Sequence, residues 1–256
     1  MRIFMVQYTS RSQLKDHARD KMAGQYGNAI LMSVCEGLIT FSLTFAVSMV
    51  FTMISTIQIL MGGSGESNLA EFLLLTLCTT VCSVFTGVFR TGATLFYLNL
   101  SCGRPATVSN LFYGYKYMFK KSLIVSAVII LLNAVCSLPY EICYFLMGKS
   151  TDKIPLALLC IAFIIIGMCV YLPIAFGLSQ SFYLLLDFPQ YSASEIMKLS
   201  FRIMKGHKWE LFCLRLSFLP MYLLGLLSFG IGNLWVKAYQ SMTCSLYFLD
   251  LMQGKH

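Results

Sequence analysis

The stretch IPLALLCIAFIIIGMCVYLPIAFGLSQSFYLLL, residues 154–186, decides the class of fold. It contains no charged residue. A helix needs about 20 apolar residues to cross the hydrocarbon layer of a bilayer, so this run is longer than one span requires. We therefore expect a membrane-spanning helix here that is either tilted or broken.

The same length criterion predicts five further spans on either side of this run. They are expected at about residues 37–61, 72–100, 122–147, 209–229 and 231–251. A glycine-rich turn at residues 228–233 separates the last two, and Lys237 and Asp250 shorten the uncharged part of the sixth. The sequence thus predicts an all-α fold, a polytopic transmembrane helix bundle of six spans, within a membrane domain at residues 29–252.

The overall composition agrees with a membrane protein and excludes an ordinary soluble domain. Hydrophobic residues make up 57% of the chain and charged residues 12%, with a mean hydropathy of +0.72. A typical soluble domain has about twice that share of charge. Nearly all of the ten cysteines lie inside apolar runs, which favours reduced, buried thiols over a disulfide scaffold.

The distribution of lysine and arginine predicts the orientation. Fourteen basic residues fall on one side of the expected spans: Arg2, Arg11, Lys15, Arg19, Lys21, Arg104, Lys116, Lys120, Lys121, Lys198, Arg202, Lys205, Lys208 and Lys255. Only Lys149 and Lys153 fall on the other. Because basic residues are retained on the cytoplasmic side, we expect a multi-pass protein of the cell membrane with both termini in the cytoplasm. The net charge of +8 then suits anionic lipid headgroups, and we expect no nucleic-acid partner.

Two polar segments are predicted to form amphipathic cytoplasmic helices. In the N-terminal segment, residues 1–28, a capping box at residues 10–13 precedes Leu14, Ala18 and Met22 at helical spacing. A second capping box opens a helix at residues 192–205, which carries apolar residues on one face and basic residues on another. We expect both helices to lie in the headgroup layer, and a docking surface for a partner protein is the alternative.

The C-terminal region resembles the signature of a bacterial integral membrane family catalogued as domain of unknown function 975. The matching positions are Ser200, Met204–Lys208, Leu211-Phe212, Leu216–Phe218, Gly230–Trp235 and Tyr239. The chain departs from the pattern at Pro220-Met221, where the family has a Gly-Trp pair, and at Ala238, where it has a proline. The resemblance implies a multi-span membrane protein and carries no catalytic residues to transfer.

Six charged residues fall within the expected spans and are the candidate functional residues. By expected depth they combine as Glu36 with Arg90, Arg215 with Asp250, and Glu141 with Lys237. Charges inside a membrane are costly and usually face the bundle interior. They either neutralise one another or line a polar pathway for an ion or small solute, with Arg90 and Glu36 as the expected lining.

Prolines in three spans are candidate hinges, because proline removes a helical hydrogen bond. They are Pro139, Pro173 and Pro220, and Pro173 in the over-long run 154–186 is the strongest candidate. Broken helices mark some transporter binding sites, although proline also occurs in spans for packing alone.

The sequence contains no metalloprotease motif, no serine hydrolase motif and no Walker loop. We therefore expect no enzyme and no cofactor or metal site. The leading hypothesis is a non-enzymatic accessory component of export, envelope or lipid handling. A small-solute or ion channel or secondary transporter is the first alternative, and a lipid-modifying membrane enzyme is the second. The expected partners are the anionic bilayer and either another membrane protein or a second copy of the chain.

Overall fold

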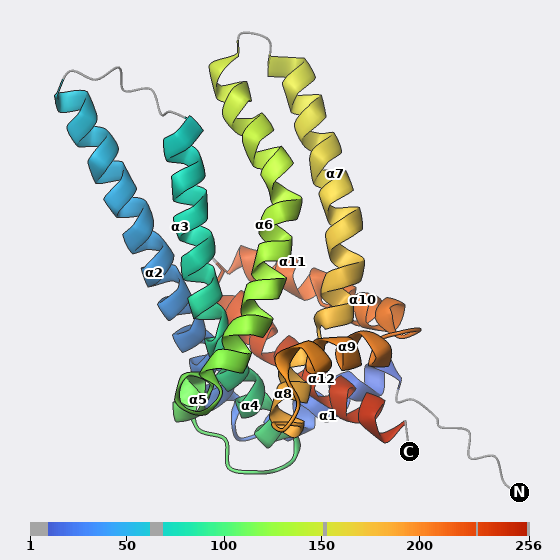
Figure 1. The fold of residues 1–256 in the computed structure, drawn as a ribbon. Helices are drawn as coiled ribbons and strands as arrows, with labels where there is room; N and C mark the ends of the chain where they lie inside the picture. The colour runs from blue at the N-terminus through green and yellow to red at the C-terminus, as the bar shows by residue number, and fades with distance from the viewer. Residues whose placement is uncertain (1–9, 62–68, 151–152, 229, 255–256) are drawn as a thin grey trace, which may run out of the picture. The chain divides into compact units, whose positions relative to one another are not determined.

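The computed structural model describes residues 10–61, 69–150, 153–228 and 230–254. These residues form helices and no strand (Figure 1), which confirms the all-α prediction. The elements are α1 (Arg11–Met22), α2 (Tyr26–Leu60), α3 (Leu69–Gly87), α4 (Phe89–Ser101), η1 (Val108–Phe112), α5 (Tyr113–Tyr117), α6 (Phe119–Lys149), α7 (Lys153–Leu178), α8 (Ser181–Asp187), α9 (Ala193–Ile203), α10 (Lys208–Leu216), α11 (Leu219–Leu227) and α12 (Ile231–Gln253).

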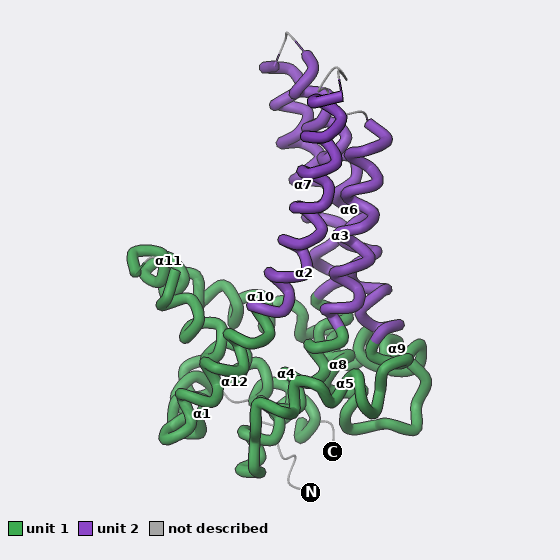
Figure 2. Tube along the Cα trace, turned by 90° about the vertical axis from the view of Figure 1, so that its left-hand side faces the viewer, with its two compact units in different colours: residues 1–37, 88–122, 176–256 green, residues 38–87, 123–175 purple. Residues whose placement is uncertain are grey.

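The chain divides into two compact units (Figure 2). Unit 1 contains residues 1–37, 88–122 and 176–256, and unit 2 contains residues 38–87 and 123–175. Unit 1 therefore combines the N-terminal segment, the middle of the chain and its C-terminal third. The expected succession of an N-terminal segment, residues 1–28, and a membrane domain, residues 29–252, stays a prediction.

Unit 2 is built from the long apolar parts of α2, α3, α6 and α7. The Gln58 amide donates a hydrogen bond of 3.2 Å to Glu71, which joins α2 to α3. The rings of Phe72 and Phe145, 5.1 Å apart, join α3 to α6. Helices α6 and α7 approach closely at Gly167, where a Cβ atom would lie 2.8 Å from the carbonyl oxygen of Cys136. Small residues at such crossings are typical of helix packing in membranes.

Five helical stretches of the described chain are long and apolar enough to cross a membrane. They are residues 26–60, 69–101, 119–149, 153–187 and 208–227. Their large apolar side chains are largely exposed, including Phe41 at 65%, Leu131 at 51% and Ile165 at 56%. A soluble protein rarely exposes so much contiguous apolar surface, so this surface is compatible with contact with lipid. Helix α12, which covers the sixth expected span, is not among the five.

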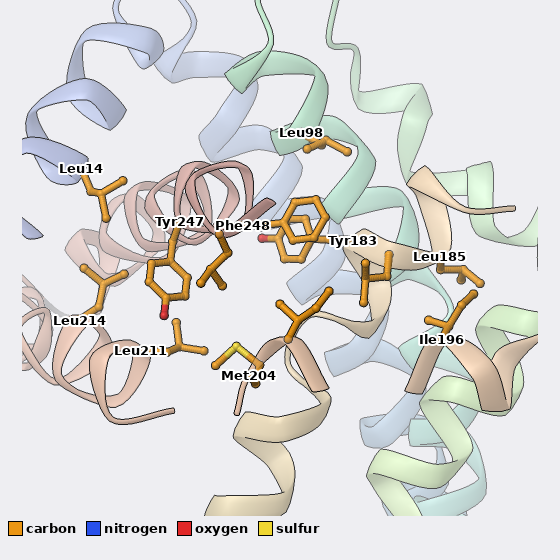
Figure 3. Packing of buried hydrophobic residues seen from close by; sticks show 13 residues of the cluster. Leu14, Leu98, Tyr183, Leu185, Ile196, Met204, Leu211, Leu214, Tyr247 and Phe248 are labelled. Atoms are coloured by element: carbon orange, nitrogen blue, oxygen red, sulfur yellow. The ribbon is translucent and has the colours of Figure 1, made fainter. Parts of the chain in front are cut away.

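Unit 1 contains the main buried apolar cluster, drawn in Figure 3. It gathers side chains from α1, α4, α8, α9, α10 and α12. The rings of Tyr183 and Phe248 stack with centroids 4.9 Å apart, and Leu184, Met204 and Leu211 of the same cluster are fully buried. Segments far apart in the sequence thus share one core.

The two predicted amphipathic helices exist, and each begins with the expected capping box. In α1, the Ser10 hydroxyl accepts a hydrogen bond from the backbone N–H of Gln13, and in α9 the Ser192 hydroxyl accepts one from the backbone N–H of Glu195. Their apolar faces, however, are covered by the protein itself. The buried residues on these faces are Leu14, Ala18, Met22, Ile196 and Ile203. The apolar faces of both helices therefore belong to the core of unit 1, and the contact of these helices with the headgroup layer stays a prediction.

Helices α11 and α12 form a hairpin through the predicted glycine-rich turn, of which Phe229 lies outside the described residues. Gly230 has a φ of 84°, a conformation that glycine adopts without strain. At Gly225 a Cβ atom would lie 2.0 Å from the side-chain oxygen and 3.0 Å from the backbone nitrogen of Asn233, so the two helices approach closely here. On another side, α12 packs against α1, where the Tyr239 hydroxyl donates to the carbonyl oxygen of Lys15 at 2.9 Å.

The three candidate hinge prolines occupy two kinds of position. Pro139 and Pro173 lie inside the helices α6 and α7, which continue past them. Pro220 lies in the first turn of α11, after the break that separates α11 from α10. The over-long run 154–186 is broken as expected, but the break falls at Ser179-Gln180, between α7 and α8, and not at Pro173.

Candidate functional site: a cationic cavity in unit 1

A cavity of about 450 Å³ lies within unit 1 and brings together four of the six candidate charged residues. We call it the unit 1 cavity. It is lined by Glu36, Arg90, Ala93, Thr94, Tyr97, Ser179, Gln180, Phe182, Tyr183, Arg215, Tyr222, Lys237, Gln240, Ser241 and Cys244. Its size falls in the range of about 300–1,000 Å³ that is typical of small-molecule sites.

Helix α4 contributes one continuous face to the cavity. Arg90, Ala93, Thr94 and Tyr97 follow one another at i, i+3, i+4 and i+7, the spacing that places side chains on one side of a helix. Gly92 of the same helix has to lack a side chain, because a Cβ atom there would lie 2.2 Å from the carbonyl oxygen of Leu111. The segment η1 therefore packs directly on the α4 backbone and helps to fix which face of α4 lines the cavity.

Helix α12 contributes a second face with the same spacing. Its cavity residues are Lys237, Gln240, Ser241 and Cys244. Lys237 forms an ion pair with Glu36 of α2, with 2.8 Å between the ammonium nitrogen and a carboxylate oxygen. This pair ties the first long helix of the chain to the last one.

Two guanidinium groups complete the charge of the cavity. Arg90 lies over the ring of Phe182 at 5.6 Å, and Arg215 lies over the ring of Phe176 at 5.3 Å. Within the described residues, neither guanidinium has a carboxylate partner. Both arginines line the cavity together with Tyr183. Stacking on an aromatic ring holds an arginine while its donors stay available.

Neutral polar groups surround the charges. The Tyr97 hydroxyl donates to the carbonyl oxygen of Ala29 at 3.0 Å and lies 2.8 Å from the Ser33 hydroxyl. The Tyr222 hydroxyl donates to Gln240 at 2.7 Å. Gln180, only 2% exposed, has a buried side-chain oxygen without a hydrogen-bond partner in the structure. A buried amide oxygen without a partner is costly, which indicates a site that a ligand or water completes.

The structure combines the candidate charges differently from the sequence prediction. Glu36 pairs with Lys237, a residue that was expected at the depth of Glu141 near the other face of the membrane. Arg90, the expected neighbour of Glu36, does line the same cavity. The prediction placed Lys237 too far from Glu36 because it treated α12 as an isolated straight span and matched charges by their depth along it.

The remaining two candidates lie elsewhere. Asp250 lines a separate hollow of about 310 Å³ in unit 1, with Ser10, Arg11, Leu14, Glu210, Leu214 and Tyr247. Arg215, its expected neighbour, lines the unit 1 cavity instead. Glu141 belongs to unit 2, where the Ser137 hydroxyl donates to it at 2.8 Å.

Several neutral residues of the cavity were missed at the level of sequence. The polar triplet Ser179-Gln180-Ser181 interrupts the uncharged run 154–186 and marks the end of α7. The stripe from Lys237 to Cys244 at i, i+3, i+4 and i+7 is a second readable signal, since an apolar span has no need of one polar face.

The fold and the cavity define an all-helical protein with helices apolar enough to span a membrane and with a charged pocket in unit 1. Residues 5–255 match the family described as "Protein of unknown function (DUF975)", and the chain belongs to this family. No curated protein matches the chain, and no solved structure matches it.

Proposed function

We propose that this protein is a non-enzymatic integral membrane component that acts by binding a ligand in the unit 1 cavity. The observation that carries this proposal is the chemistry of the cavity walls. Arginine does not exchange protons under physiological conditions, and the carboxylate of Glu36 is already engaged by Lys237. Such groups bind and orient a ligand more readily than they transfer protons to it.

Among the accessory roles in export, envelope or lipid handling, the geometry favours lipid handling. A charged cavity in a chain with long, exposed apolar helices suits a molecule that has both a polar and an apolar part. The full chain, purified in a neutral detergent and examined by native mass spectrometry, is expected to retain membrane lipid. Incubation with labelled membrane lipids is expected to give binding without a product. Formation of a product would instead support the lipid-modifying enzyme.

A channel or secondary transporter is the second candidate, and the joint presence of Glu36 and Arg90 in one cavity favours it. In that case Glu36→Ala or Arg90→Ala would change the flux of a small solute in proteoliposomes while the protein stays folded. Equal flux for the wild type and both variants would exclude this candidate.

For the topology, we propose an even number of crossings with both termini in the cytoplasm of a cell membrane. Support comes from the hollow that Ser10 and Arg11 share with Asp250, because it brings the two ends of the chain together. Six crossings result if both the α10–α11 segment and α12 cross; five would separate the ends. Protease accessibility of tags at both ends, in sealed right-side-out vesicles and in lysed ones, tests this proposal.

For the partners, we propose that the basic polar faces of α1 and α9 contact anionic lipid headgroups. Arg11, Arg19, Lys198 and Arg202 are exposed on these helices and support the proposal. A membrane-protein partner or a second copy of this chain would contact the apolar helices, and we propose no nucleic-acid partner. Sedimentation with vesicles that contain or lack anionic lipid separates headgroup binding from protein association.

A further inference from the structure

Resting on the binding role proposed above, we propose that the unit 1 cavity binds a phosphoryl dianion, a phosphate monoester or free phosphate, between Arg90 and Arg215. Both guanidinium groups line the same cavity, and each stacks on its own phenylalanine ring. Arginine binds phosphate with two parallel hydrogen bonds, which a stacked guanidinium can form at once.

The charge balance of the cavity selects the class of anion. Its walls carry three cations, Arg90, Arg215 and Lys237, and one carboxylate, Glu36, which leaves two positive charges in excess. A phosphate monoester carries about −1.5 to −2 at neutral pH. A carboxylate or a phosphodiester carries one negative charge and would leave the cavity charged. The monoester or phosphate dianion therefore matches the walls best.

The partners of the guanidinium groups within the protein support the same conclusion. The ion pair of Glu36 is with Lys237, on α12, and leaves Arg90 and Arg215 as the cations without a carboxylate partner among the described residues. Surface arginines without partners are common, but these two line one cavity. Two positive charges in one cavity repel each other, and an anion bound between them removes this repulsion.

Gln180 supplies an independent observation. Its side chain is buried and lines the cavity, and its amide oxygen has no hydrogen-bond partner. An acceptor next to cationic donors suits a ligand that carries a hydroxyl beside its phosphoryl group, or a phosphate that retains one proton. The cavity volume of about 450 Å³ also exceeds what one phosphate group fills, which leaves room for such a neighbouring group.

Binding of three soluble probes to the full chain in a neutral detergent tests this site. The probes are dihexanoyl phosphatidate, a monoester lipid; dihexanoyl phosphatidylglycerol, a diester lipid; and inorganic phosphate. For a headgroup site, calorimetry is expected to give a higher affinity for phosphatidate than for phosphatidylglycerol. Comparable affinity for inorganic phosphate and phosphatidate would identify free phosphate as the source, and it also supports the site.

Charge variants locate the site, because they are expected to act in opposite directions. Arg215→Gln and Arg90→Gln should each weaken phosphatidate or phosphate binding about tenfold or more, the loss of one charge-assisted contact. Glu36→Gln should strengthen binding, because it raises the excess charge from two to three. Arg104→Gln removes an exposed arginine that follows α4 and lies outside the cavity, and it should leave the affinity unchanged. If Arg215→Gln does not fold, Arg215→Lys, which keeps the charge, is measured in its place.

The outcomes separate this inference from the binding role on which it rests. Equal weakening by Arg104→Gln and Arg215→Gln, or tighter binding of phosphatidylglycerol than of phosphatidate, would overturn the dianion site and leave a binding protein. Retention of neutral lipid alone by the purified chain would also overturn the site only. Absence of any bound lipid or solute, together with no response to all three probes, would overturn both.

Discussion

Glu36 and Lys237 form an ion pair of 2.8 Å that joins α2, near the start of the chain, to α12, near its end. The carboxylate side chain is 21% exposed and the lysine side chain is 42% exposed, so water screens the pair only in part. The pair stands at the wall of the unit 1 cavity and fixes two of the helices that line it.

A double-mutant cycle on this pair is expected to give a coupling free energy of about 0.2–1 kcal/mol, the range for partly exposed pairs. The variants are Glu36→Gln, Lys237→Met and the two combined, measured by thermal unfolding in detergent. The reversed pair Glu36→Lys with Lys237→Glu should recover part of the stability that either reversal alone removes. Strict additivity of the single variants would show that the pair contributes nothing.

Replacement of Gly92 by alanine is expected to destabilise the protein by about 1–3 kcal/mol, as overpacking does. The new Cβ atom would meet backbone oxygens of Leu111 and Asn110 at 2.2 and 2.4 Å, and backbone cannot rotate away. Gly27→Ala is the matched control, because that Cβ atom would have no neighbour within 4 Å. The midpoint of thermal unfolding should fall for Gly92→Ala and not for Gly27→Ala.

The capping box of α9 is expected to weaken in acid while that of α1 does not. Glu195 accepts hydrogen bonds from the backbone and hydroxyl of Ser192, each 2.8 Å, and these bonds hold its pKa below the usual value. A lowered folded-state pKa gives stability that is complete above the usual glutamate pKa of about 4.3 and is lost as the pH falls through the lowered value.

The same position in α1 is Gln13, which accepts from the Ser10 amide at 3.1 Å and does not titrate. Hydrogen-exchange protection of the first turn, corrected for the intrinsic pH dependence, should therefore fall in α9 relative to α1 below about pH 4. The variant Glu195→Gln should remove this difference. Parallel behaviour of the two helices in acid would contradict the prediction.

Maleimide labelling of two exposed cysteines is expected to distinguish contact with water from contact with lipid. Cys102, after α4, and Cys169, within α7, are both exposed on the protein surface. If α7 crosses a bilayer, Cys169 faces hydrocarbon, and a membrane-impermeant maleimide should not label it in native membranes. Cys102 should be labelled once the cytoplasmic side is opened. The labelling of each cysteine is measured in a variant that lacks the other nine thiols. Labelling of Cys169 in sealed membranes would refute a spanning α7.

Much of the fold could be predicted because bilayer thickness imposes a minimum length on apolar runs. Helices cover most of the described residues in each of the six predicted stretches, and both capping boxes stand where Ser10 and Ser192 predicted them. Helix α12, with 23 residues, is long enough to span but is not among the five candidate spans, and Lys237 and the polar stripe beside it lower its apolar character. Helix periodicity could have indicated this, since the stripe repeats at helical spacing.

The site was predictable only in its charged members. Arg90, Glu36, Arg215 and Lys237 were recognised because charges in apolar runs are rare, whereas their grouping depends on tertiary contacts between α2, α4, α10 and α12. Depth along a span predicts which residues lie at one level, but it does not predict which faces of the helices meet. The neutral residues Gln180 and Tyr183 are ordinary in an apolar sequence and become significant only when the cavity is known.

The packing of α1 on α12 has a consequence for how the chain is made. The helix with Leu14 is synthesised early, but the surface that covers it, which includes Tyr247 and Leu251, belongs to the last of the described helices. Unit 1 can close only once α12 has been synthesised. Nascent chains that stop short of α12 would leave an apolar face open to the cell's chaperones and proteases.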